Sequence, residues 1–238
     1  MNGPQRFYYT YTTNQTPPVP APGFHTSRVE LQHILLAYVV LTVDLAIILN
    51  GDGALSLAAA SGSFSLSWEV VLLAAIAALT GFLAHEMAHK YYAQRHGFWA
   101  EFRMSPFGLI FSLLTAFVGF LFAAPGATLV QGMSDIRSWG RTALAGPVSN
   151  LIFAGAFLVG TFSAAIWGAG LFWVGALALL TFFNAWFAAF NLIPFGPLDG
   201  AKVWRWSRPV WAGTLALSAA LAILAYGISN YGWWLPVR

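Results

Sequence analysis

The segment 81–90 places a metal-binding pattern in apolar surroundings, and this pairing limits how the whole chain can fold. It contains an H-E-x-x-H pattern made by His85, Glu86 and His89, and it follows an apolar run over 70–84. On a helix, residues four apart share a face, so the two imidazoles can bind one metal ion. Glu86 lies beside them and can act as a general base toward water. Ionisable groups in such a setting are costly, and they indicate a functional site.

The composition indicates a membrane protein. Of the 238 residues, 58% are hydrophobic and only 8% are charged, whereas soluble domains carry roughly 25% charged residues. Apolar runs of about 20 residues recur along the chain, which predicts several membrane-spanning helices and contact with a lipid bilayer. The net charge of +3 is too small to favour a nucleic-acid partner. Cysteine is absent, so a zinc site would have to use histidine and carboxylate ligands.

The apolar runs divide the chain into a tail and one transmembrane domain. Residues 1–27 contain five prolines and predict a flexible N-terminal tail. Residues 28–238 predict a single transmembrane domain that contains the metal motif, with a candidate catalytic core at about 68–205. The five predicted spans are 30–49, 68–94, 142–162, 171–192 and 209–229. The first span contains Asp44, which either serves as a gating or proton-relay group, or snorkels to the helix end or pairs with a neighbouring helix.

The segment 106–130 is apolar enough to span, but the distribution of basic residues argues against a crossing. If the chain enters and leaves on one face here, ten of the eleven Lys and Arg residues lie on the same side, and only Arg238 lies opposite. We therefore predict a re-entrant segment with a break at Pro125 and Gly126. The predicted fold class is an all-α polytopic membrane protein of five to six transmembrane helices, re-entrant around 100–130. The end of the molecule that carries the basic residues and the metal motif should face the cytoplasm. The cell membrane is the simplest location for such a protein.

A catalytic zinc ion usually has a third protein ligand. With 106–130 re-entrant, the fourth span returns to the side where His85 and His89 lie, and Asp199 follows its end in a Pro- and Gly-rich segment. Unwound backbone there could bring this carboxylate to the imidazoles. Asp135 and Glu101 are rival ligands, although both lie in polar, basic neighbourhoods that suit solvated side chains. Without a metal, Asp199 would be a turn residue and the histidines a hydrogen-bonded core pair.

Three motifs over roughly residues 80–205 resemble those of the site-2 protease family of intramembrane zinc metalloproteases. The first is the H-E-x-x-H at 85–89. The second is Gly146-Pro147-x-x-Asn150. The third is Asn191-x-x-Pro194 with Leu198-Asp199-Gly200 following. The chain departs from the family in having Gly196 where a second proline is often found, with a proline one residue later.

The resemblance implies a role for each matching residue. One zinc ion per chain would be held by His85, His89 and Asp199, and Glu86 would be the catalytic base. Asn150 and Asn191 would bind the substrate backbone or stabilise the oxyanion. The resemblance also implies a re-entrant β-hairpin after the first motif, with residues 122–130 as one of its strands.

The predicted function is hydrolysis of a peptide bond within or near a transmembrane helix of a membrane-protein substrate. The alternative is a zinc-binding membrane protein without proteolysis, such as a metal transporter or an inactive chaperone-like relative. A transporter should carry further polar residues across the membrane, and an inactive relative should have lost Glu86. The sequence does not indicate an oligomeric state.

Overall fold

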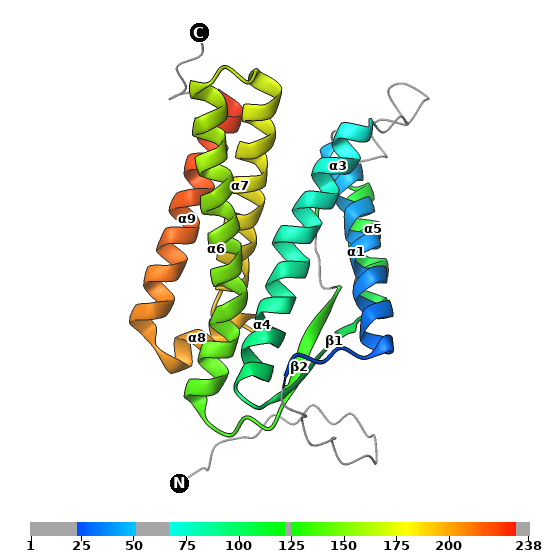
Figure 1. Cartoon of the computed structure of the whole chain (residues 1–238), viewed down its shortest axis with the longest axis vertical. Coiled ribbons are helices and arrows are strands. Elements are labelled where there is room, and N and C mark those ends of the chain that lie inside the picture. The colour runs from blue at the N-terminus through cyan, green and yellow to red at the C-terminus, as the bar shows by residue number, and fades with distance from the viewer. Residues whose placement is uncertain (1–22, 51–66, 122–124, 232–238) are drawn as a thin grey trace.

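The structure, a computed structural model, describes residues 23–50, 67–121 and 125–231. Its dominant feature is a set of long apolar helices that run side by side (Figure 1). Within the described residues, five helical stretches are long and apolar enough to cross a membrane: Arg28–Leu49, Trp68–Arg95, Ile136–Ile166, Leu171–Asn191 and Arg208–Ser229. The prediction of a polytopic helical membrane protein is therefore confirmed.

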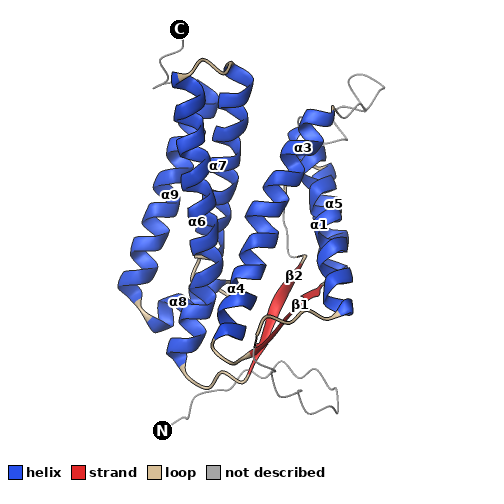
Figure 2. Cartoon of the chain, in the orientation of Figure 1, coloured by secondary structure: helices blue, strands red, loops and turns tan. Residues whose placement is uncertain are grey.

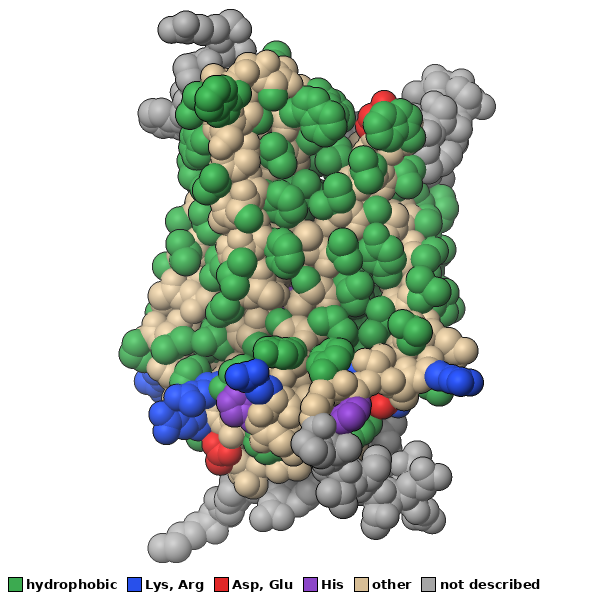
Figure 3. Space-filling model, in the orientation of Figure 1, with side chains coloured by type: hydrophobic (Ala, Val, Ile, Leu, Met, Phe, Trp, Pro, Cys, Tyr) green, Lys and Arg blue, Asp and Glu red, His purple; other side chains and the backbone are tan. Residues whose placement is uncertain are grey.

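Charge and apolar surface are separated along the long axis of the molecule. On the face seen in Figure 3, hydrophobic side chains cover the tall central part, and Lys and Arg side chains gather at the lower end. Arg6 and Arg238 lie outside the described residues, and the nine other basic residues belong to elements that start or end at this lower end. An integral membrane protein with one basic end follows from this distribution.

The second span is continuous but not uniform. It comprises α3 (Trp68–Ala77), a π-helical turn (Ala78–Leu83) and α4 (Ala84–Arg95), which together match the predicted helix over 68–94. Single π-helical turns inside α-helices are rare and are frequent at functional sites. Here the π turn immediately precedes the H-E-x-x-H motif.

The segment after α4 turns back on itself, as predicted. Strand β1 (Trp99–Met104) pairs antiparallel with β2 (Gly126–Gln131), and helix α5 (Pro106–Phe117) lies between them. The amide of Ser105 donates to the carbonyl of Pro125 over 2.8 Å, so both ends of the insert meet. Helix α5 has 12 residues and is roughly 18 Å long, too short for a bilayer core of about 30 Å.

The hairpin is the only sheet in the described part of the chain, and Figure 2 shows it among the helices toward the lower end of the molecule. The implied strand over 122–130 overlaps β2, which starts at Gly126. Residues 122–124 lie outside the described residues. A Cβ on Gly126 would lie 2.4 Å from the carbonyl oxygen of Arg103, so the sharp return into β2 requires glycine.

Helix α6 (Ile136–Ile166) begins six residues before the predicted start at 142. The carboxylate of Asp135 caps it by accepting a hydrogen bond of 2.8 Å from the amide of Ser138, which satisfies one of the free donors of the first turn. The predicted start at 142 would have placed Gly146 and Pro147 near the beginning of the helix. They lie well inside it, a position where neighbouring helices make a proline tolerable in membrane proteins.

After α7 (Leu171–Asn191) the chain forms a short helix, α8 (Asp199–Trp206), before α9 (Arg208–Tyr231). The sequence analysis missed α8 and expected Asp199 on unwound backbone, which is wrong because Asp199 is the first residue of this helix. The reason is tertiary: α8 packs against α6, where a Cβ on Gly140 would lie 2.3 Å from the side chain of Trp206.

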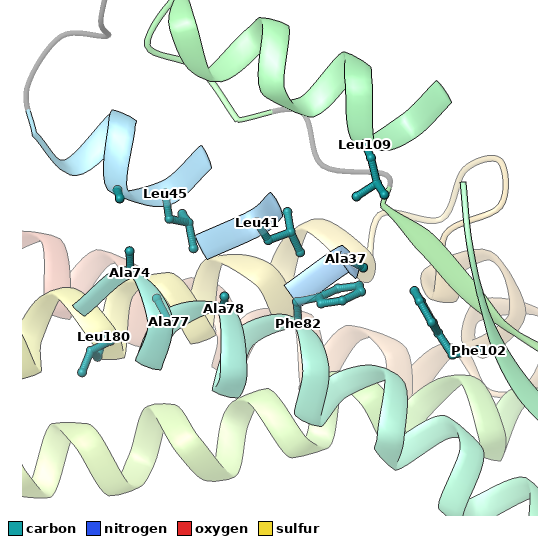
Figure 4. Packing of buried hydrophobic residues seen from close by; sticks show 11 residues of the cluster. Ala37, Leu41, Leu45, Ala74, Ala77, Ala78, Phe82, Phe102, Leu109 and Leu180 are labelled. Carbon is teal, nitrogen blue, oxygen red and sulfur yellow. The ribbon is translucent and has the colours of Figure 1, made fainter. Parts of the chain in front are cut away.

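Helix α1 (Arg28–Leu49) packs on the second span through a core of small and large apolar side chains. Figure 4 shows this cluster, in which Leu41 and Leu45 face the alanines of α3. Small residues let membrane helices approach closely. Asp44 is fully buried on α1, so the snorkelling explanation is wrong. Its polar neighbour is Ser112 of α5, and neither carboxylate oxygen has a partner of ordinary hydrogen-bond geometry among the described residues.

The end of the predicted tail is attached to the fold. The amide of His25 donates to the side chain of Gln94 on α4 over 3.0 Å, and Ser27 caps α1 by accepting from the amide of Glu30. Residues 1–22 lie outside the described residues, so the flexible tail remains a prediction for them alone.

Candidate metal centre

The structure brings His85, His89 and Asp199 into one buried cluster, although 114 positions separate His85 from Asp199. The Nε2 atoms of the histidines lie 3.0 Å apart, and Oδ2 of Asp199 lies 3.2 Å from Nε2 of His85 and 3.0 Å from that of His89. A tetrahedral zinc ion with bonds of about 2.0 Å would hold its ligand atoms roughly 3.3 Å apart. The donor set and its spacing therefore fit zinc.

Hydrogen bonds on the far side of each imidazole fix its orientation. Nδ1 of His89 lies 2.7 Å from the carbonyl oxygen of Thr142, which can only accept, so Nδ1 carries the proton and Nε2 presents its lone pair to the cluster. Nδ1 of His85 lies 2.6 Å from Oδ1 of Asn150. Nδ2 of Asn150 donates to the carbonyl of Gly81 over 2.8 Å, which confirms that its oxygen faces the imidazole.

The π-helical turn and α6 are thus joined behind the histidines. Nδ2 of Asn150 also lies 3.3 Å from the carbonyl of Thr80, within the same turn. A second buried amide, Asn184 of α7, donates to the hydroxyl of Thr80. These contacts hold three helices together immediately behind the ligand atoms.

Gly146 explains why α6 can pass so close to the ligands. A Cβ at this position would lie 2.4 Å from Nε2 of His89 and 2.6 Å from Nε2 of His85. Any side chain here would therefore push α6 away or displace the imidazoles. Gly200, beside Asp199, is similarly confined, because its Cβ would lie 2.1 Å from the carbonyl oxygen of Leu192.

The carboxylate of Asp199 sits at the start of α8, where the helix dipole favours negative charge. Oδ1, the other oxygen, lies 3.3 Å from Nζ of Lys202. One oxygen thus faces the histidines while the other is held by a partly exposed cation.

Glu86 lies outside the ligand cluster and contacts the hairpin. Its Oε2 accepts a hydrogen bond of 2.8 Å from the amide of Thr128, and the hydroxyl of Thr128 lies 2.8 Å from the same oxygen. Glu86 is half-buried rather than sealed. Its carboxylate is therefore both fixed and accessible, as a general base must be.

A cavity of about 240 Å³ joins the three ligands to Glu86. Its wall comes from α4, β2, the start of α6, the end of α7 and α8. Aromatic side chains border it on two sides, from Trp139 of α6 and from Phe187 and Phe190 of α7. The lining is thus mostly apolar, with the metal cluster, Glu86 and Lys202 as its charged groups.

The rival ligands lie elsewhere. Asp135 is exposed at the cap of α6, where hydrogen bonds from the side chain and backbone of Ser138 lower its pKa. Glu101 pairs with Arg103 within β1. Neither belongs to the His-His-Asp cluster found among the described residues.

The two asparagines have different places. Asn150 is fully buried behind His85 and does not line the cavity, so its expected contact with substrate or an oxyanion does not fit the structure. Asn191 lines the cavity and donates from Nδ2 to the carbonyl of Phe187, so its substrate role remains a prediction. The sequence analysis missed Thr128, Thr142 and Lys202 as site residues. Only the i, i+3 spacing of Lys202 from Asp199 could have indicated one of them.

Comparison with known proteins agrees with this site. No family model matches the chain, and no solved structure matches it. A curated protein of the archaeon Methanocaldococcus jannaschii, described as "Putative zinc metalloprotease MJ0611", is 35% identical over 147 residues, which cover 60% of this chain and 74% of that protein. The chain belongs to the same zinc metalloprotease family. The buried His-His-Asp cluster fits this assignment.

Proposed function

We propose that this chain is an intramembrane zinc endopeptidase of the site-2 protease type, with one zinc ion held by His85, His89 and Asp199. The observation that carries the proposal is the cavity in which this cluster and Glu86 meet. His85 lies ten residues before the end of α4, about 15 Å along the helix axis, which supports a site below the membrane surface. The basic end supports a cytoplasmic orientation, most simply in the cell membrane.

Each side chain has a task in peptide hydrolysis. A zinc ion held by the three ligands would supply Lewis-acid chemistry, which polarises a carbonyl and makes water easier to deprotonate. Glu86 takes the proton from the attacking water and passes it to the leaving amine. Asn150 and the carbonyl of Thr142 keep the imidazoles oriented. Lys202 holds the second oxygen of Asp199 and adds positive charge at the cavity.

A transmembrane substrate hides its scissile bond inside its own helix. The backbone amides and carbonyls of a helix bond to one another, and the side chains surround them. A transmembrane substrate must therefore open its helix locally before the scissile bond can reach Glu86, and unwinding also exposes backbone groups hidden in the helix.

Strand β2 offers a partner for those exposed groups. Within the described residues it pairs only with β1, and four of its residues line the cavity: Gly126, Ala127, Thr128 and Val130. An unwound substrate segment added along this border would gain backbone hydrogen bonds by β-augmentation. The substrate would then lie between β2 and the metal cluster.

The test is cleavage of a transmembrane reporter by the purified full chain in detergent, with bound zinc measured in every sample. Glu86→Gln should keep its zinc and lose cleavage, because the ligands remain but the base is gone. Asp199→Asn should lose zinc and cleavage together. Glu101→Gln and Asp135→Asn are matched controls, since both remove a carboxylate that lies away from the cluster.

The outcomes separate the two function classes. Cleavage by wild type that Glu86→Gln abolishes supports the endopeptidase. Zinc binding that depends on Asp199, without cleavage of any of several unrelated reporters, favours the non-proteolytic zinc protein. Cleavage by Glu86→Gln at the wild-type rate overturns the role of Glu86.

A further inference from the structure

At one rung of the hairpin, the outward-facing amide of each strand donates to a carboxylate. Phe102 of β1 lies opposite Thr128 of β2, and the amides of both residues point away from the partner strand. The amide of Phe102 donates to Oε1 of Glu30 over 2.9 Å. The amide of Thr128 donates to Oε2 of Glu86 over 2.8 Å. One of these carboxylates is the proposed base, and the other comes from α1.

The outer edge of β1 is fixed by a sealed ion pair. Glu30 and Lys90 are fully buried, and Nζ of Lys90 lies 2.5 Å from Oε2 of Glu30. Nζ also donates to the hydroxyl of Thr26 over 2.8 Å. Glu86 and Lys90 are four residues apart on α4, so they share one helix face. The hairpin is therefore held to that face at both edges, directly through Glu86 and indirectly through Lys90 and Glu30.

The two oxygens of Glu86 have unequal surroundings. Oε2 has two donor groups of Thr128 within 2.8 Å, the amide and the hydroxyl. The same hydroxyl also lies 3.0 Å from the backbone carbonyl of Glu86, so its one proton serves either acceptor. Within the described residues, Oε1 of Glu86 has no hydrogen-bond partner, and the side chain lines the cavity. A carboxylate held by one oxygen keeps the other ready to accept a proton.

We propose that Thr128 is the positioning residue of the catalytic base: it holds Oε2 of Glu86 so that Oε1 faces the cavity and takes the proton of the attacking water. The inference rests on the proposed function and deepens it, because it assigns a role to the hairpin beyond binding substrate. In the transfer, the O–H bond of water breaks, the proton binds Oε1, and the electron pair stays on the attacking oxygen. The proton later leaves Oε1 for the amine.

Thr128→Val removes the hydroxyl and keeps both the side-chain shape and the backbone amide. We expect unchanged zinc content and a fall in kcat of about ten-fold, the lower end of the 10–100-fold range for groups that orient a site residue, with little change in KM. Thr128→Ser should restore kcat, because it returns the hydroxyl. Thr161→Val is the matched control, since the hydroxyl of Thr161 bonds only to its own helix at Phe157.

A second readout does not depend on choosing a cleavable substrate. Acetohydroxamate binds zinc and presents an acidic O–H to a neighbouring base, so its affinity reports whether Glu86 is in place. Thr128→Val should weaken this affinity in wild type and have no further effect in Glu86→Gln. Thr128→Ser should bind as tightly as wild type.

The inference is overturned if Thr128→Val keeps the wild-type kcat and hydroxamate affinity, if Thr128→Ser fails to restore them, or if Thr128→Val loses zinc. If one of these results is found while wild type cleaves or binds hydroxamate through Glu86, the proposed function stands and only the inference about Thr128 fails. If wild type holds no zinc and binds no hydroxamate, the proposed function fails, and the inference that rests on it fails as well.

Discussion

Helix α4 carries two buried polar clusters whose residues are neighbours in the chain. His85 and His89 meet Asp199 on one side, and Lys90, directly after His89, meets Glu30 on another. Both clusters satisfy the rule that a buried charge needs a partner. They differ in access, because the His-His-Asp cluster borders a cavity of about 240 Å³, whereas neither Lys90 nor Glu30 lines it and both are fully buried.

This difference separates a reactive site from a structural one. A sealed ion pair cannot meet a substrate, so its effect is confined to holding α1, α4 and β1 in register. A cluster open to a cavity can exchange ligands and protons. Buried ionisable groups of one helix thus hold neighbouring elements together in one cluster and form a candidate metal site in the other. Substitutions should therefore affect zinc at the first cluster and stability at the second.

The largest effect on zinc is expected from Gly146→Ala. The added Cβ would lie 2.4 Å from Nε2 of His89, so either α6 or the imidazole must move, and zinc binding should be lost. Gly155→Ala on the same helix is the control, because a Cβ there meets nothing within 4 Å. Zinc content of the two purified variants is the measurement. Full zinc occupancy in Gly146→Ala would contradict the close approach of α6.

The largest effect on stability is expected from Lys90→Met, which leaves Glu30 buried without its cation. Breaking a buried pair in this way costs about 3–5 kcal/mol in the free energy of unfolding. The double variant Glu30→Gln with Lys90→Met should recover most of that loss, since the glutamine keeps an acceptor for the amide of Phe102. Unfolding in mixed detergent micelles measures both values.

The partly exposed pair of Glu101 with Arg103 offers the control for this prediction. Glu101→Gln should cost less than about 1 kcal/mol, because solvent reaches this pair and screens it. Equal losses for Lys90→Met and Glu101→Gln would show that burial does not distinguish the two pairs.

A smaller effect on zinc is expected from Asn150→Ala. The substitution removes the acceptor for Nδ1 of His85 but leaves all three ligands in place. Loss of such an orienting group should weaken zinc affinity about 10–100-fold. Thr181→Val is the control, because Thr181 is equally buried and its hydroxyl bonds only to its own helix at Leu177. Competition with a zinc chelator measures the dissociation constants, and equal values for the two variants would refute the orienting role.

The smallest effect is expected from Asp135→Asn at the cap of α6. Hydrogen bonds from Ser138 lower the pKa of Asp135, so its contribution to stability is complete above the unfolded pKa and is lost as pH falls through the folded pKa. Asparagine can cap the helix but does not titrate. The stability of the variant should therefore fall slightly less than that of wild type as the pH is lowered, and its zinc content should be unchanged. Unfolding curves at a series of acid pH values test this. A steeper decline than in wild type would contradict the sign.

The membrane helices and the metal motif were predictable because each depends on local chemistry. A run of about 20 apolar residues can satisfy its backbone in a bilayer only as a helix, and two histidines four apart share a helix face wherever the helix lies. The re-entrant segment was also predictable, because the basic residues report which side each loop occupies. Asp199 was reached by joining these arguments, because the topology returns it to the side of two histidines that need a third ligand, and the family resemblance implied the same role.

The rest was decided by tertiary packing. Residues 199–206 form a helix because they pack against α6. Lys90, which the sequence analysis used only as one of the basic residues on one side, is buried because Glu30 of α1 and Thr26, just before α1, pair with it. Asn150 became an orienting group because α6 passes behind His85. The sequence by itself determined which groups can bind a metal and which segments cross a membrane. Only the tertiary structure decided which groups meet, since partners for buried polar atoms come from distant parts of the chain.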